Sequence, residues 1–455
     1  MASVPGGYGN LENRLVRIQD RIQGPREPAP PYVLSEAVAG ERHEVAVKAP
    51  QRHAGGGCCL ACGDVSAGGS LDEVDRDLDL FIDRQHIIEC MDSRAQILDR
   101  ACKPGHPIGA MPLDARLPHR ARLTDMRFGA FTPQGWRHDL GGVPVDQQWP
   151  TILSTAKAIE DLGFESVWVY DHFHPVPEPT QEPVYEAWTL MAALAATTET
   201  VRLGQMCTCN SYRPPTYLAK VAASIDAISG GRLEMGIGAG WYEHEYDGYG
   251  YEFPKASVRI GMLREGVEIM RRMWTEDVVD YDGTYYSLKG ALCQPKPVQD
   301  PMIPMWVAGG GPKLTLNIAA RYADYTNFAY TLDEFKEKSE ILAGHCRDVG
   351  RDFDEIVRST NLNIVIGETE AEVAERTAAI KAHFTPVVGA DKVDKMFDNN
   401  YVNGGGMAGT PEQIIERLRE WEAAGLGYAI VYFQEAGTDR RGLELFANQV
   451  MPHLV

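Results

Sequence analysis

The chain has no apolar run long enough to cross a membrane and no amino-terminal secretory signal. A transmembrane helix needs roughly 18 or more consecutive apolar residues, and the sequence contains no such run. A signal peptide begins with a charged segment followed by an apolar one, and the first residues lack that order. The nine cysteines are odd in number and irregularly spaced, unlike a disulfide framework. We therefore expect a cytoplasmic protein that does not contact membranes.

Positive charge and three common catalytic motifs are also missing. The formal net charge of −20 repels phosphate backbones, so we expect no nucleic-acid partner. The sequence lacks a Walker loop, an HExxH pair and a GxSxG elbow, so P-loop ATPase, zincin and serine-hydrolase functions are not predicted. Cys59-Leu-Ala-Cys62 has the spacing of half a zinc site, but no second pair completes it, and we expect no metal.

The first 125 residues are poor in aromatic side chains, which are confined to Tyr8, Tyr32 and Phe81. They are rich in glycine, proline, alanine and arginine, a composition typical of linkers. Helical spacing predicts one helix over 70–100, and a single helix cannot bury its own apolar face. We expect 1–125 to be a poorly ordered extension, or the product of a start assigned upstream of Met126. The folded domain is then 126–455.

From Met126 onward, short apolar runs alternate with amphipathic stretches that are typical of helices. Eight strands in alternation with helices favour a (β/α)8 TIM barrel over an open sheet. Three longer stretches, 241–257, 278–298 and 383–408, are predicted loop insertions, and an Asp-Gly turn in the second predicts a hairpin. The predicted strands are 126–133, 166–172, 201–209, 233–240, 304–311, 324–330, 355–367 and 428–434. The predicted helices are 149–163, 186–198, 215–231, 259–274, 312–323, 333–349, 369–382, 411–425 and 439–450.

Four polar or glycine-rich groups follow neighbouring strands of this barrel. Barrel enzymes place their sites at the carboxyl ends of the strands, so these groups should meet at one mouth. Adjacent strand residues point in opposite directions, which predicts separate roles for Asp171 and His172. Bare amides at 309–311, before a helix predicted to start at Pro312, form an anion site with Lys313 nearby. The groups are Asp171 with His172, 208–210, 238–241 and 309–311.

Each of these groups also has a purely structural interpretation. An aspartate at a strand end can cap a helix, with the neighbouring histidine lying on the surface. "GIGAG" at 236–240 can reflect close backbone packing at the barrel mouth, and GxGxG is a weak sign of a dinucleotide site. The glycines of 309–311 can form a plain turn. The chemical interpretation rests on all four groups reaching the same mouth.

Several motifs in order resemble the bacterial luciferase-like superfamily, and most of all its coenzyme F-420 (deazaflavin)-dependent oxidoreductases. The match runs from Met126 to about 329 and is looser beyond. The first 125 residues have no part in it. The motifs include "GFESVWVYDHFHP", "VRLGQMCTCNSYRPPTYLAKVAASIDAISGGRLEMGIGAGWYEHEY", "EIMRRMWTE", "YYSLKGALCQPKPVQ" and "MWVAGGGPKLTLNIAARYAD".

The resemblance implies a deazaflavin lying across the barrel mouth and a hydride transfer between it and a small organic substrate. It implies that His172 is the catalytic acid or base and that a non-proline cis peptide lies near Met206–Cys207. We also expect a homodimer. The coenzyme contacts that the resemblance implies are Asp171, Met206, Cys207, Cys209, Ala239, Gly240, His244, Gly310, Gly311 and Lys313.

One position departs from the sugar-phosphate dehydrogenases of this superfamily. They carry a glutamate directly after the glycine that ends the fourth strand, and here that position is Trp241. A sugar-phosphate substrate is therefore not predicted. We expect the Trp241 side chain to line the substrate pocket or to cover a face of the coenzyme ring. Two alternatives stay open: an FMN-dependent monooxygenase supplied with reduced FMN by a separate reductase, and a non-catalytic flavin-binding protein.

Overall fold

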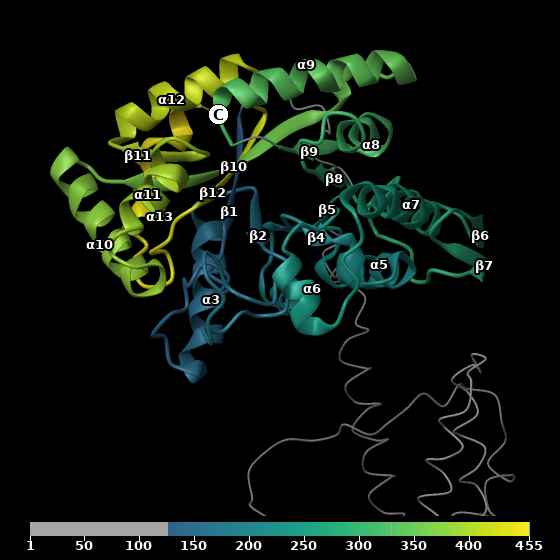
Figure 1. Ribbon diagram of the computed structural model, residues 1–455, viewed down its shortest axis with the longest axis horizontal. Coiled ribbons are helices and arrows are strands. Elements are labelled where there is room, and N and C mark those ends of the chain that lie inside the picture. Colours follow the sequence, from purple (N-terminus) through teal and green to yellow (C-terminus); the bar gives the residue numbers. More distant parts are fainter. Residues whose placement is uncertain (1–125, 329, 455) are drawn as a thin grey trace, which may run out of the picture. The chain divides into compact units, whose positions relative to one another are not determined.

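The computed structural model describes residues 126–328 and 330–454, which form a closed barrel of parallel strands surrounded by helices (Figure 1). The barrel strands are β1 (Arg127–Phe131), β2 (Ser166–Val169), β3 (Arg202–Gln205), β5 (Leu233–Gly238), β8 (Met305–Ala308), β9 (Tyr325–Asn327), β10 (Val357–Ile366) and β12 (Tyr428–Tyr432). They neighbour one another in that order, and the ring closes where β12 pairs in parallel with β1. The predicted barrel and all eight of its strands are confirmed.

Four further strands among the described residues lie outside the set of eight barrel strands. β4 (Thr208–Cys209) continues the direction of β3 and pairs with β5, and β11 (Gly406–Gly409) pairs in parallel with the last four residues of β10. The hairpin predicted in the second insertion is confirmed as β6 (Val279–Asp282) and β7 (Ser287–Ala291), which pair antiparallel. The first and third insertions were predicted as loops, and this is wrong for both. The first contains a helix (Glu243–Tyr249), and the third contains the end of one helix (Glu370–Val388), a second helix (Val393–Phe397) and β11. The glycines and small side chains of β11 carry no alternating apolar pattern, so pairing with β10 decides its conformation.

Helices cover the outside of the barrel, one or more between successive strands (Figure 1). Their apolar faces pack on the sheet, and their ends follow local signals, as at Thr410 and Gln413, which form a capping box. The helices are α3 (Val145–Asp161), α4 (Ala187–Thr197), α5 (Pro215–Ser229), α6 (Glu243–Tyr249), α7 (Ala256–Thr275), α8 (Thr315–Tyr322), α9 (Leu332–Val349), α10 (Glu370–Val388), α11 (Val393–Phe397), α12 (Pro411–Ala423) and α13 (Arg441–Gln449). Single turns of other helix types span Asn210–Tyr212, Phe353–Glu355, Asp398–Val402 and Met451–His453.

The start of α8 differs from the sequence prediction, which placed Pro312 in the first turn. Residues 312–314 form a turn, and the helix begins at Thr315. The backbone carbonyl of Pro312 accepts a hydrogen bond from His345 Nε2 at 2.7 Å, and the amide of Leu316 donates to Gly311 instead. The hydrogen bond from Leu316 thus passes over the Pro312 carbonyl, which a residue of α9 contacts.

Aromatic side chains fill the interior of the barrel. Trp168 of β2 packs edge-on against Trp306 of β8, with ring centres 4.7 Å apart, and Trp306 stacks on Tyr325 at 4.0 Å. A Cβ on Gly204 of β3 would lie 2.3 Å from the Trp168 ring, so the indole occupies the space that this glycine leaves. The lumen is a packed core rather than a channel, and any site must lie at an end of the barrel.

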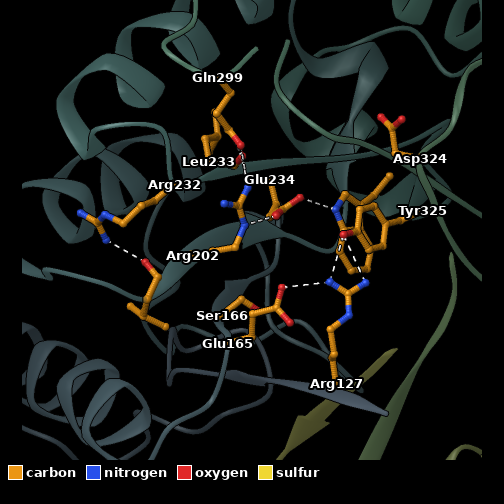
Figure 2. A network of polar contacts seen from close by, with 12 residues as sticks. Arg127, Glu165, Ser166, Arg202, Arg232, Leu233, Glu234, Gln299, Asp324 and Tyr325 are labelled. Carbon is orange, nitrogen blue, oxygen red and sulfur yellow. Dashed lines mark hydrogen bonds and ion pairs between the residues drawn. The ribbon is translucent and has the colours of Figure 1, made fainter. Parts of the chain in front are cut away.

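A network of charged and aromatic residues closes the amino-terminal end of the barrel (Figure 2). Arg127 bonds Glu165 and the Tyr325 hydroxyl, each at 3.2 Å. Glu234 accepts from Arg202 and, at 2.6 Å, from Trp306 Nε1. These side chains come from the first residues of strands or from just before them. This end of a TIM barrel serves stability, since function sits at the other end.

Replacing Glu234 with glutamine is expected to lower the free energy of unfolding by about 3 kcal/mol, because it leaves the Arg202 guanidinium without its countercharge. Urea unfolding measures the effect. Glu355→Gln, which breaks an exposed ion pair with Arg351, is the matched control and should change little. Equal stability of the two variants would contradict a stabilising role for this network.

Several expectations fall on residues that the structure does not describe. The helix predicted over 70–100, the CxxC motif at Cys59–Cys62 and the character of the 1–125 extension lie outside the described residues. Within 126–328 and 330–454, no helix is both long and apolar enough to span a membrane. Over the same ranges, no group of three or more histidine, cysteine or acidic side chains is placed to hold a metal ion.

Candidate functional site

The carboxyl ends of β2, β3, β5 and β8 carry the polar and glycine-rich residues that the sequence singled out. These strands are consecutive neighbours in the barrel, so Asp171, His172, the 206–209 segment and the 238–241 segment share one side of the mouth. The glycine turn at 309–311 follows β8 on the same side. The structure thus brings the predicted groups together at one end of the barrel.

His172 is held by a buried carboxylate that sequence reasoning did not select. Its Nδ1 lies 2.8 Å from Glu245 Oε2, and Glu245, in α6, is fully buried. The imidazole also stacks on Trp136, with ring centres 4.4 Å apart and planes within 7°. Nε2 has no hydrogen-bond partner among the described residues, and the side chain is 12% exposed. One nitrogen is therefore fixed, and the other is free to meet a ligand.

Glu245 is ionised although it is buried. Burial alone would raise the pKa of this carboxyl, but hydrogen bonds from His172, the His174 amide and the Tyr212 hydroxyl lower it below its ordinary value. The amides of Phe173 and His174 donate to Oε1 at 2.6 and 2.8 Å. An anion beside Nδ1 favours the tautomer that carries a proton there, which leaves Nε2 as the nitrogen that can meet a ligand.

Because the folded state depresses its pKa, Glu245 contributes stability above its unfolded pKa of about 4.5 that is lost as the pH falls further. Glu245→Gln is therefore expected to lower the free energy of unfolding at pH 7, and this deficit should narrow as the pH drops below about 4.5. Urea unfolding of both proteins at several pH values measures it, with Glu243→Gln, exposed on the same helix, as the control. A deficit that stays constant with pH would show that Glu245 is not the titrating group.

Asp171 and His172 have different partners, but strand alternation does not explain this, because β2 ends at Val169. Its two oxygens accept from both terminal nitrogens of Arg213 at 2.7 and 2.9 Å, and Oδ2 also accepts from the Cys209 amide at 2.8 Å. Asp171 is buried. Arg213 Nη2 also donates a hydrogen bond to Glu186 Oε1 at 2.6 Å. The carboxylate thus fixes the segment after β3 and the position of Arg213. Direct contact between Asp171 and a coenzyme stays a prediction, and Arg213 is a neighbour that the sequence did not reveal.

The peptide bond between Met206 and Cys207 is cis, which confirms the position that the family resemblance implied. It lies in the interruption between β3 and β4. Burial raises the pKa of the Cys207 and Cys209 thiols to about 12, so neither thiol is a thiolate nucleophile at neutral pH. Cys209 Sγ lies 3.0 Å from the Tyr246 hydroxyl, which ties this segment to α6. Both cysteines serve as packing surface at the mouth.

The segment after β5 forms the rim next to His172. Gly240 has a φ of +81°, and a Cβ there would lie 2.0 Å from the Tyr246 hydroxyl, so only glycine fits. Trp241 is 62% exposed, and its ring meets that of His172 edge-on with centres 5.9 Å apart. His244 Nδ1 lies 2.9 Å from His174 Nδ1, so that nitrogen is already engaged at the rim. A contact between His244 and a coenzyme stays a prediction.

The glycine turn leaves a side-chain-free surface before α8. Gly309 has a φ of +116°, whereas Gly310 has an ordinary φ, and a Cβ there would meet nothing closer than Lys338 Cε at 3.5 Å. Lys313, the cation that the sequence singled out, is exposed. Lys338 of α9 is the cation that borders Gly310, and it was missed because it lies distant in the chain. Bare amides beside a lysine suit a phosphate group.

Comparison of the sequence with known proteins identifies a family and several relatives. The family model described as luciferase-like monooxygenase matches residues 126–427. An F-420-dependent glucose-6-phosphate dehydrogenase from Nocardia farcinica (strain IFM 10152) is 30% identical over 67% of this chain and 93% of its own length. A 5,10-methylenetetrahydromethanopterin reductase from Archaeoglobus fulgidus (strain ATCC 49558 / DSM 4304 / JCM 9628 / NBRC 100126 / VC-16) is 28% identical over 68% of this chain and 97% of its own length.

A solved structure agrees at the level of the fold. An F-420-dependent secondary alcohol dehydrogenase, in complex with an F-420-acetone adduct, superimposes with a TM-score of 0.59. The alignment covers 73% of this chain and 99% of that one, at 24% sequence identity. The family match spans more than half of the chain, from the first strand of the barrel almost to its last. The chain belongs to the luciferase-like monooxygenase family.

Proposed function

We propose that this protein is an F-420-dependent oxidoreductase that transfers a hydride between the deazaflavin and a small organic substrate. The observation that carries the proposal is His172, fixed at the barrel mouth through Nδ1 by the buried, ionised Glu245, with Nε2 free. A deazaflavin supplies or accepts a hydride, and the protein must add a binding slot, a phosphate anchor and a proton donor or acceptor. The relatives named F-420-dependent dehydrogenases support this choice of coenzyme.

The residues present fit such a coenzyme. The glycine turn at 309–311 offers backbone that Gly310 leaves open, and Lys338 borders it, so this turn would hold the phosphate. The segments at 206–209 and 239–240 would line the ring on the neighbouring side of the mouth. Asp171 and Arg213 would support the coenzyme indirectly. Asp171 accepts from the Cys209 amide and from Arg213, and so fixes the 206–209 segment.

His172 would move the proton that accompanies hydride transfer. Glu245 favours the tautomer with a proton on Nδ1, so Nε2 can accept or donate one at the reacting atom of the substrate. Trp136 restricts rotation of the imidazole by stacking on it, and Trp241 stands edge-on at the open side. The aromatic surroundings favour a substrate with a flat, weakly polar body, in keeping with Trp241 in place of the glutamate of the sugar-phosphate enzymes.

The runner-up function is an FMN-dependent monooxygenase, which the description of the matching family favours. A side-by-side titration of the purified protein with F-420 and FMN separates the two proposals. We expect F-420 to saturate one site per chain and FMN to bind more weakly. Tighter binding of FMN would favour the monooxygenase, and binding of neither would contradict both.

A further inference from the structure

Arg137 holds a guanidinium at the mouth of the barrel, across from the glycine turn. It lies in the segment that follows β1. Its Nη1 donates to Asn363 Oδ1 at 2.7 Å, and its Cζ lies 4.9 Å from the centre of the Tyr432 ring. Asn363 is near the carboxyl end of β10, and Tyr432 is the last residue of β12. Arg137 therefore borders the part of the mouth formed by β10, β12 and β1, which the proposed coenzyme contacts do not use.

No carboxylate pairs directly with Arg137 among the described residues, although Asp139 is near enough to interact with its charge. A guanidinium carries five N–H donors, and Arg137 forms no ion pair with a carboxylate in the part of the chain that the structure describes. Asp139, the nearby acid, is engaged by the amides of Gln134 and Gly135 and by the Tyr432 hydroxyl. Among the other partly buried arginines, Arg127, Arg202, Arg213 and Arg376 pair with acids. Arg232, Arg259 and Arg358 form no ion pair among the described residues either, and their guanidinium groups donate to backbone carbonyls.

Aromatic side chains connect this guanidinium to the proposed reaction centre. Trp136, the residue before it, stacks on His172 and also packs on Tyr170, with ring centres 4.1 Å apart. Tyr170 is hydrogen-bonded to Arg137, so one aromatic group connects the arginine to the stack that supports His172. A group bound at Arg137 would thus lie on the same mouth as Nε2 of His172, on the side away from the glycine turn.

We propose that Arg137 binds a carboxylate of the substrate, so that the enzyme acts on organic acids whose reacting carbon reaches His172. This inference rests on the proposed function. The planar fork of a guanidinium matches a carboxylate in a bidentate pair, and its single charge balances that of the carboxylate. A phosphate monoester carries about −1.5 to −2 charges and would call for further cations. Asn363 orients the guanidinium by holding Nη1.

The test is a calorimetric titration of the protein, with and without F-420 bound, with benzoate, its neutral isostere benzamide and inorganic phosphate at constant ionic strength. We expect benzoate to bind more tightly than benzamide or phosphate. Arg137→Gln should weaken benzoate binding by about tenfold or more, through loss of a charge-assisted pair. Arg321→Gln, an exposed arginine of α8, removes the same charge and should leave the affinity unchanged.

A second variant keeps the arginine. Asn363→Asp places a carboxylate where the amide oxygen now accepts from Arg137, and it should block benzoate binding while the protein stays folded. Unchanged benzoate affinity in both variants, or equal affinity for benzamide, would overturn the proposal. So would a loss of F-420 affinity in Arg137→Gln, because the arginine would then serve the coenzyme. Benzoate binding through Arg137 in a protein that takes no F-420 would leave the carboxylate site standing and refute the proposed function.

Discussion

Replacing His172 with alanine is expected to lower turnover by about 10²–10⁴-fold, the usual contribution of general acid–base catalysis. Coenzyme affinity should change little, because the ring contacts Trp136 and Glu245 rather than the glycine turn. The assay needs an active substrate, which a screen of enones and imines against reduced F-420 would provide, with carboxylate-bearing compounds included. Turnover and coenzyme affinity are measured on the same preparations.

The control for this prediction is His174→Ala. His174 lies two residues away, and its ring engages His244 at the rim rather than Glu245. It should leave turnover close to that of the unaltered protein. Asp171→Ala should act on coenzyme affinity instead, since it releases Arg213 and the Cys209 amide. Full turnover in His172→Ala across the pH range would refute the acid–base role and leave His172 with a purely structural one.

Glu245 offers an independent check on how His172 works. If the carboxylate acts only by fixing the imidazole, Glu245→Gln should alter the pH profile of turnover, and its effect should vanish when His172 is already alanine. Independent effects in the double variant would show that Glu245 acts on something else at the mouth.

The barrel could be predicted from the sequence because its signals are local. Each strand is a short apolar run between turn residues, and alternation with amphipathic helices leaves few arrangements open. The rule that sites lie at carboxyl ends then brought His172 and the glycine turn to one mouth. The cis peptide at Met206–Cys207 was different, since only the family resemblance implied it.

The partners of these groups could not be read in the same way. Glu245 lies in an insertion that was predicted as a loop, and its bond to His172 depends on how α6 folds back over the mouth. Lys338 reaches Gly310 from α9, and Arg137 meets Asn363 across 226 residues of sequence. Such pairs follow from tertiary packing, and a single sequence carries no local signal for them. The first turn of α8 was mispredicted at the position where His345 of α9 contacts Pro312.

The glycine turn is the place where coenzyme binding can be broken with least harm to the fold. Gly309 has a left-handed φ, so a substitution there would strain the backbone. A Cβ on Gly311 would lie 2.7 Å from Thr315 Oγ1, so the Thr315 side chain would have to move. At Gly310 a Cβ finds ordinary contact distances, the nearest being 3.5 Å to Lys338 Cε. Gly310→Val should therefore change the surface that meets the coenzyme and leave the stability of the fold unchanged.

Gly310→Val should weaken F-420 binding by about 100-fold, because the side chain keeps the phosphate from the backbone amides and from Lys338. Fluorescence titration gives the affinity, and thermal unfolding without coenzyme verifies the fold. Gly344→Val in α9, where a Cβ would also meet nothing closer than 3.8 Å, is the matched control and should leave affinity unchanged. Lys338→Ala should weaken binding less, since the amides remain. If Gly310→Val binds F-420 normally while Lys338→Ala does not, the phosphate lies against α9 alone. If both bind normally, the anchor belongs elsewhere on the mouth.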